Sequence, residues 1–279
     1  MKILTTEPVI AVIAEMAVQN GVSEMAEWVR SRRPECMPDE YEPGDPQAWT
    51  TLLPHELFEQ DRLLSGNEVL VELAGRKCYD SFGLKAGRKS NAEYIANTQA
   101  GDVPHASIMY HAKMSFFIAG VSRRVSHELI RHYVGADRTE EGSPSQESTR
   151  YVEHSGCYVA HPAILNNSNE LALFVGAMER NYLEYRDYIQ RRTFEYADLH
   201  GGEQPKGMDR KRIFESASPY LSHACETSFI WTTNPIALAK MFKERDNEAA
   251  DLEYLRLARK WKRVCLERWP NLFPQAWMK

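Results

Sequence analysis

Several hallmarks of common protein classes are missing from this 279-residue sequence. It has no Cys-x-x-Cys pair, no apolar run near the roughly 18 residues of a membrane helix, and no clear signal-peptide cleavage pattern. Its cysteines are odd in number and widely scattered, which favours reduced thiols over disulfides: Cys36, Cys78, Cys157, Cys225 and Cys265. These absences predict a soluble, cytoplasmic protein without a membrane partner.

The chain also has fewer positively than negatively charged residues. The chain has 34 Lys and Arg against 39 Asp and Glu, so its formal net charge is −5 and we expect no nucleic-acid partner. A local basic pocket is still compatible with this balance. Hydrophobic residues make up 43% of the chain and charged residues 26%, which is typical of a globular protein with a substantial core.

The spacing of apolar residues predicts an α/β (α+β) fold, with a mixed sheet and long helices. We expect strands at 1–5, 107–120 and 226–234, and extended structure again at 148–160. Helices are predicted at 7–35, 67–79, 121–134, 168–198 and 208–220, and in two segments near the C-terminus. In the helix at 121–134, we expect Val125, Leu129 and Ile130 to point inward. Proline, glycine and acidic residues predict loops at 34–47 and 135–145.

Two histidine pairs invite a metal interpretation, and neither has the right geometry. Zinc-protease helices carry histidines four residues apart, whereas His127 and His132 in HELIRH are five apart and about 140° apart around a regular helix. His105 and His111 would lie about 20 Å apart on the predicted strand. We therefore predict no metal site.

The run SQESTRY (145–151) has two interpretations on its residues alone. Its hydroxyls, amide and guanidinium suit a nucleotide phosphate, and Arg131 would lie nearby at the end of the preceding helix. Polar residues beside arginines also form ordinary solvated surfaces. For Cys225, a buried thiol is the favoured interpretation over a nucleophile.

Several blocks in a fixed order resemble one family. They are LVELAGRKCYDSF (70–82), HASIMYHAKMSFFIAGVSRRVSHELIRHY (105–133) and SQESTRYV (145–152). Together they are similar to flavin-dependent thymidylate synthases, whose hallmark is an RHR triplet followed by a segment ending in S-x-R-Y. The run 234–258 resembles the family's late helix, with Arg245, Ala250 and Glu253 at matching positions. The resemblance covers roughly residues 66–270.

The resemblance implies an α/β fold peculiar to the family and a homotetramer with active sites shared between subunits. It implies bound FAD, with NADPH as reductant and 5,10-methylenetetrahydrofolate as carbon donor, acting on a pyrimidine nucleotide. Residues 67–279 would form the catalytic domain, and residues 1–66 an N-terminal strand plus a helical extension. Arg245 would be the catalytic residue, lying against the pyrimidine ring. The matching nucleotide contacts are Glu128, Gln146, Ser148, Thr149 and Arg150, and the flavin contacts are His105, Ser107, Arg131, His132 and Asn234.

The sequence departs from the family pattern at the expected site. Tyr133 stands at the third position of the RHR triplet, and about seven residues follow it as an insertion that contains Arg138, a candidate replacement for the lost flavin-contacting charge. Ser228 stands where the family has an arginine that would hold the substrate phosphate. The resemblance makes dUMP the default substrate, and these departures leave three alternatives open. They are another pyrimidine nucleotide such as UMP or dCMP, transfer of a hydroxymethyl group, and a non-catalytic nucleotide-binding homologue.

Overall fold

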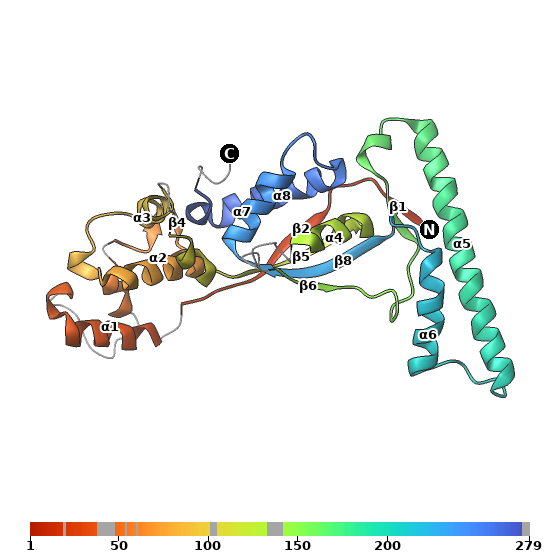
Figure 1. Cartoon of the computed structure of the whole chain (residues 1–279), viewed down its shortest axis with the longest axis horizontal. Coiled ribbons are helices and arrows are strands. Elements are labelled where there is room, and N and C mark those ends of the chain that lie inside the picture. Colours follow the sequence, from red (N-terminus) through yellow and green to blue (C-terminus); the bar gives the residue numbers. More distant parts are fainter. Residues whose placement is uncertain are drawn as a thin grey trace.

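The centre of the molecule is a four-stranded antiparallel sheet in the order β2-β5-β8-β6 (Figure 1). The computed structural model describes residues 1–18, 21–37, 48–53, 55–59, 61–100, 105–132 and 142–274. The strands are β2 (Val9–Glu15), β5 (Met114–Ser122), β8 (Glu226–Thr233) and β6 (Gly142–Gln146). Because β6 lies at the sheet edge, Pro144 fits there without breaking the ladder inside the sheet.

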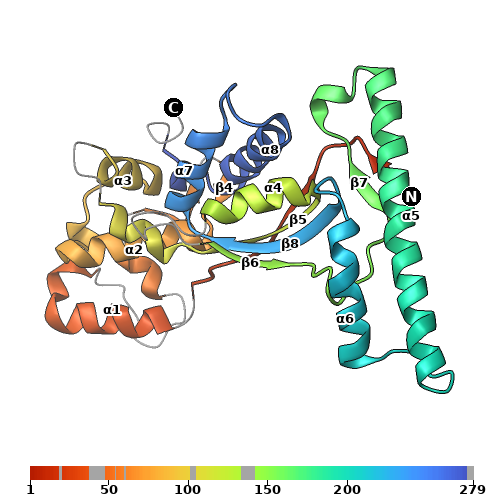
Figure 2. The same cartoon turned by 45° about the vertical axis from the view of Figure 1, so that its right-hand side comes forward.

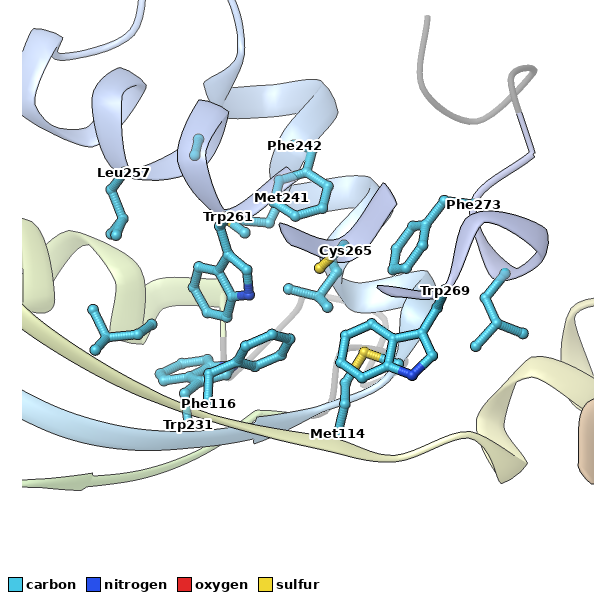
Figure 3. Close-up of a cluster of buried hydrophobic side chains, with 14 of the residues drawn as sticks. Met114, Phe116, Trp231, Met241, Phe242, Leu257, Trp261, Cys265, Trp269 and Phe273 are labelled. Atoms are coloured by element: carbon cyan, nitrogen blue, oxygen red, sulfur yellow. The ribbon is translucent and has the colours of Figure 1, made fainter. Parts of the chain in front are cut away.

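Helices α4 (Arg123–Leu129), α7 (Pro235–Arg245) and α8 (Leu252–Arg268) lie on the same side of this sheet in both views (Figures 1 and 2). Alternate residues of β5 and β8 point toward the helices, as the two-residue period of a strand requires. Phe116 meets the edges of Trp261 and Trp269, with ring centroids 5.0 and 5.9 Å apart, and these rings form the centre of the main core (Figure 3). The core therefore fixes α8 onto the sheet.

The two ends of the molecule carry separate helical groups (Figure 2). One end holds α1 (Gly21–Arg32), α2 (Gly66–Tyr79) and α3 (Asn91–Thr98), and the other holds the antiparallel pair α5 (Ser168–Leu199) and α6 (Gly207–Ala217). Two small sheets join β1 (Lys2–Leu4) to β7 (Cys157–Val159) in parallel and β3 (Phe58–Glu59) to β4 (Arg62–Leu63) antiparallel. Short 3₁₀ helices cover Pro34–Cys36, Ala48–Leu52, Gly83–Lys85, Ala106–His111, Ile130–His132, Pro162–Ile164, Ser218–Tyr220 and Pro270–Leu272.

Polar side chains define where the helices begin. Ser65 accepts a hydrogen bond from the Glu68 amide while Glu68 reaches back to the Ser65 amide, so a capping box starts α2. Asn234 accepts from the Ala237 amide before the proline that opens α7, and Asp251 accepts from two amides of α8. These caps satisfy amides that have no partner within the helix.

A group of buried polar side chains around α2, which we call the α2 network, ties the N-terminal segment to the rest of the fold. Glu72 is fully buried and accepts hydrogen bonds from His55, Arg76 and Asn91, at 2.7–3.0 Å. Glu68 is also fully buried and binds Arg62 at 2.6 and 2.8 Å. Burial opposes ionisation of Glu72, but His55 and Arg76 outweigh it and lower the pKa of this carboxyl group.

Most predicted elements are confirmed, and four predictions are wrong in part. Of the extended structure predicted at 148–160, only β7 (Cys157–Val159) is a strand, and residues 149–151 form a turn. The helix predicted at 7–35 is strand β2 followed by α1, because residues 9–15 pair with β5. The strand predicted at 107–120 begins only at Met114, since the 3₁₀ helix before it packs against α2 and α7. Part of the loop predicted at 135–145 is strand β6, and residues 133–141 lie outside the described residues.

Two smaller expectations also change. The predicted helix at 121–134 ends at Leu129 and continues as a 3₁₀ turn, so a regular helix does not relate His127 to His132. Ile130 is 40% exposed rather than inward, while Val125 and Leu129 are buried as expected. Within the described ranges, no helix has the length and apolar character needed to cross a membrane.

Candidate functional site

Helix α4 carries the candidate site, and its start is held firmly against α8. The Ser122 amide and hydroxyl both donate to the Glu253 carboxylate, at 2.7 and 2.8 Å. Arg124 donates two hydrogen bonds to Asp251, at 2.5 and 2.8 Å. Burial raises the pKa of Asp251, but the Arg124 guanidinium and the Tyr254 amide outweigh burial and lower this pKa to about 2.

One side of α4 brings together Glu128 and Arg245, two of the predicted nucleotide contacts. An Arg245 guanidinium nitrogen lies 2.6 Å from a Glu128 carboxylate oxygen, and both side chains are about one fifth exposed. The guanidinium carbon also lies 5.1 Å from the centre of the Tyr254 ring, in cation–π range. The predicted catalytic arginine is thus held in place and still accessible.

A cavity of about 410 Å³ opens on another side of α4. Gln146 lines it and donates hydrogen bonds to the hydroxyls of Ser126 and Thr227, at 2.9 and 3.0 Å. Thr149 lines it too, so two predicted nucleotide contacts share this cavity. Its full lining is Arg123, Ser126, His127, Ile130, Gln146, Thr149, Ser218, Pro219, Leu221, Ser222 and His223.

The segment after β6 places the remaining predicted nucleotide contacts. Ser148 accepts a hydrogen bond from the Arg150 amide, at 3.3 Å, within a turn that directs the chain away from the sheet. The Arg150 guanidinium lies 3.3 Å from Glu215 of α6 and is 55% exposed. An exposed pair of this kind contributes little to stability, so Arg150 is available to a ligand.

The nucleotide contacts implied by the resemblance therefore divide into two groups. Ser126, which binds Gln146, and Glu128, which binds Arg245, are two positions apart on α4 and so about 200° apart around it. We call the two groups together the α4 site. Within one chain, the Gln146 group and the Arg245 group face different directions.

Four of the six predicted flavin contacts have side chains that the structure describes. His105 and Ser107 are exposed at the start of the 3₁₀ helix that packs against α7, and Asn234 is the residue that caps α7. Arg131 is exposed just after α4. Arg138 and the His132 side chain lie outside the described residues, so their roles stay predictions.

No metal cluster is found in the part of the chain that the structure describes. There, no three His, Cys, Asp or Glu residues could hold one ion, although the strand spacing used above for His105 and His111 does not apply to a 3₁₀ helix. The prediction that Cys225 is a buried thiol is confirmed, because it has no exposed surface and burial raises its pKa to about 12.

Sequence reasoning missed the cavity-lining residues Arg123, Ser126, His127 and His223. The first three stand at positions i, i+3 and i+4 of α4, a spacing that places them on one helix face. That polar stripe was visible in the sequence. The contribution of His223 was not, since it comes from the residues before β8 and depends on the folded chain.

Comparisons with known proteins agree with this architecture. The family described as "Thymidylate synthase complementing protein" matches residues 61–271, about three quarters of the chain. The chain belongs to this family. A flavin-dependent thymidylate synthase of Mycolicibacterium vanbaalenii is 36% identical over 211 residues, which cover 75% of this chain and 79% of that protein. The corresponding protein of Mycobacterium leprae is 33% identical over 211 residues, covering 75% and 78%.

The crystal structure of a UMP/dUMP methylase, PolB from Streptomyces cacaoi bound with 5-Br UMP, shares the fold. It is 15% identical, covers 99% of this chain and 97% of its own, and has a TM-score of 0.56. The expected family and its α/β fold are therefore confirmed. The chain is a methyltransferase-type enzyme of the flavin-dependent thymidylate synthase family.

Proposed function

We propose that this enzyme methylates C5 of a uracil nucleotide, with dUMP as the default substrate. FAD would be its cofactor, 5,10-methylenetetrahydrofolate its carbon donor and NADPH its reductant. The observation that carries the proposal is the fixed position of Arg245 between Glu128 and Tyr254. Family membership supplies the reaction class.

The chemistry explains why a fixed arginine is needed. C5 of a uracil ring is a poor carbon nucleophile until negative charge develops on the ring carbonyl oxygens. A guanidinium already in position stabilises that charge without reorganising during the reaction. Arg245 can fill this role without a cysteine adding to the ring, and the high pKa of Cys225 leaves that thiol protonated.

The described residues fit a flavin. The Asn234 side-chain nitrogen is buried and has no hydrogen-bond partner in the described part of the chain, so it can donate to a ring carbonyl. His105 and Ser107 are exposed on the 3₁₀ helix that packs against α7, and the exposed Arg131 offers a cation. Bound FAD would supply the hydride chemistry, while these side chains would bind and orient it.

We also propose that the enzyme is a homotetramer with shared sites. The support is the division of the nucleotide contacts between two sides of α4, which leaves each chain with two partial sites. The sheet face opposite α4, α7 and α8 in the views of Figures 1 and 2 also exposes large apolar side chains, namely Val9, Phe117 and Ile230. Sharing can be tested by mixing inactive Arg150→Ala and Arg245→Ala subunits. Recovery of activity on mixing supports shared sites, and no recovery contradicts them.

A reducing compartment suits this enzyme. All five cysteines are free thiols, and three of them are buried. We therefore propose that it acts in the cytoplasm.

The decisive experiment is mass spectrometry of the products made by the FAD-loaded enzyme. The assay contains methylenetetrahydrofolate and NADPH with dUMP, UMP, dCMP and CMP together. A gain of about 14 mass units on dUMP alone is expected, since one CH₂ is added. A gain on another nucleotide, or one of about 30 units from CH₂O, would change the substrate or the transferred group. A flavin-loaded protein that forms no product would overturn the proposal.

A further inference from the structure

Helix α5 forms one edge of the molecule, where α6 lies beside it and no described element lies beyond it in either view (Figures 1 and 2). Its covered side packs Met178, Tyr185 and Ile189 into two small apolar clusters. Its opposite side carries Leu183, which is 53% exposed, and Phe194, which is 75% exposed. Single exposed apolar side chains are ordinary on a protein surface, so the residues around these two decide whether this side of α5 binds a partner.

The residues around Leu183 and Phe194 form a regular row along α5. All of them are exposed, and they follow one another at intervals of three or four residues, which keeps them on one side of a helix with 3.6 residues per turn. We call this row the α5 stripe, and in chain order its members are Arg180, Leu183, Asp187, Arg191, Phe194 and Asp198.

The α5 stripe is complementary to its own reverse. Along the chain it reads positive, apolar, negative, positive, apolar, negative, so the reversed order places each charge against the opposite charge. A second, antiparallel copy of α5 would pair Arg180 with Asp198, Asp187 with Arg191 and Leu183 with Phe194. All three pairs have their midpoint at or next to Ile189, so one two-fold axis generates all of them, each twice.

The charges also exclude a parallel partner in register. Each charged residue would then face its own copy, and like charges across a helix contact are unfavourable. Antiparallel pairing instead lets the opposite charges set orientation and register, while Leu183 and Phe194 supply apolar surface to bury. The stripe is about 27 Å long at 1.5 Å per residue, and one row of side chains cannot bury the roughly 1,200–2,000 Å² of a stable interface. The contact therefore needs other surfaces of the same assembly.

We propose that the α5 stripe binds the α5 stripe of a second copy of this chain in antiparallel orientation, and that this contact helps to hold the homotetramer together. The inference rests on the proposed homotetramer for the number of subunits. The contact itself is argued from the exposure and the charge order of α5 alone.

The test reverses one charge at a time and then both. Sedimentation velocity of the full-length protein over a range of concentrations measures its assembly. Asp187→Arg would face Arg191 of the partner subunit on both sides of the two-fold axis, so association should weaken at least about tenfold. Arg191→Asp should have an equal effect, because it would face Asp187 of the partner subunit.

Two combinations should restore assembly. A chain that carries both Asp187→Arg and Arg191→Asp regains opposite charges in each pair and should assemble like the unmodified protein. An equimolar mixture of the two single variants should also assemble, because every pair between unlike chains is then attractive. Recovery in either case requires folded chains, which separates a lost contact from a lost fold.

Two more variants serve as control and as a probe of the apolar pairs. Arg186→Asp is the matched control, because Arg186 is exposed and adjoins Asp187 in sequence but lies about 100° away around the helix. Its assembly should equal that of the unmodified protein. Phe194→Ser should weaken association at low and high salt alike, whereas the losses from the two charge reversals should shrink at high salt.

The outcomes distinguish this contact from the tetramer itself. Single reversals that assemble like the unmodified protein, or a double variant that assembles no better than they do, would overturn the α5 contact and leave the proposed tetramer and its reaction standing. An unmodified dimer that the single reversals dissociate supports the α5 contact and contradicts the tetramer. An unmodified protein that stays monomeric at every concentration overturns both.

Discussion

Charged side chains gather in the α2 network and in the α4 site, and the two groups differ in burial and in pairing. In the α2 network, Glu68, Glu72 and Arg76 are at most 1% exposed, and each carboxylate has several donors. In the α4 site, Arg245 and Glu128 are about one fifth exposed, and Arg123 has no acid among its described contacts.

The difference predicts which charged side chains stabilise the fold and which are available to a ligand. A buried ion is tolerated only when its partners replace water, so the α2 network leaves no free charge for a ligand. Partly exposed cations can bind an anion that arrives from solvent. Changes in the α2 network should therefore affect stability, and changes in the α4 site should affect ligands and turnover.

The largest expected effect is on stability, from Arg76→Met. This change leaves the fully buried Glu72 without its arginine and also removes donors to the Ser81 and Ala86 carbonyls. Breaking a buried ion pair from one side costs about 3–5 kcal/mol. Urea denaturation should show a loss of that size in the free energy of unfolding. A fall of less than about 1 kcal/mol in the free energy of unfolding would contradict this prediction, because the α2 network would then contribute little to stability.

The next largest effect is a fall in kcat, which is expected in the variant Arg245→Ala. Removing one preorganised group that stabilises developing negative charge lowers kcat by about 10²- to 10³-fold or more. Stability and FAD content should change little, because the side chain is partly exposed. Single-turnover kinetics with dUMP, beside an absorbance spectrum of the flavin, measures both. Retained methylation would show that another group activates the ring.

The sequence alone predicted the helices and strand that have one clear apolar face. Helices α2, α5 and α6 and strand β8 were expected within a few residues of their observed bounds. Strand β2 was not, because VIAVIAE is apolar at nearly every position and matches a helix or a strand. Its conformation is decided by pairing with β5, about a hundred residues later in the chain. Local spacing carries no information about such a partner.

The sequence supplied the candidate residues of the site but not their arrangement. Motif order made Glu128, Gln146 and Arg245 candidates, and only the folded chain shows that Glu128 and Arg245 form an ion pair while Gln146 faces another side of α4. Arg123 and Arg124 are also indistinguishable in sequence. Their different roles follow from Asp251, which lies more than a hundred residues away and neutralises only Arg124.

Lowering the pH should have a smaller effect on the free energy of unfolding, because it protonates Asp251. Its pKa is lowered from 3.8 to about 2, chiefly by Arg124 acting against burial, so the ionised form favours the folded state. This stabilisation is present above pH 3.8 and is lost as the pH falls toward 2. Each pKa unit is worth about 1.4 kcal/mol, and partial exposure reduces the total to about 1–2 kcal/mol.

Asp251→Asn isolates this contribution, because asparagine is an equally good helix cap and carries no charge. Unfolding free energies measured between pH 5 and about 2 should fall more steeply for the unmodified protein than for the variant. Parallel curves would show that the Arg124–Asp251 pair does not fasten α4. The α4 site would then depend on other contacts for its position.

The smallest effect is expected from Arg259→Ala, beside the end of α7 that carries Arg245. Arg259 donates to Asp246 at 3.0 Å but is 59% exposed, and Asp246 keeps a second partner in Lys262 at 2.9 Å. An exposed pair contributes about 0.2–1 kcal/mol, so urea denaturation should show a change within that range and kcat should stay the same. Asp246 directly follows Arg245, which makes this variant a matched control for the loss of an arginine at the same helix end. A large fall in kcat would mean that the position of Arg245 depends on surface charge as well as on Glu128 and Tyr254. Charged side chains outside the α4 site would then also control turnover, and the distinction drawn between the two groups of charges would be wrong.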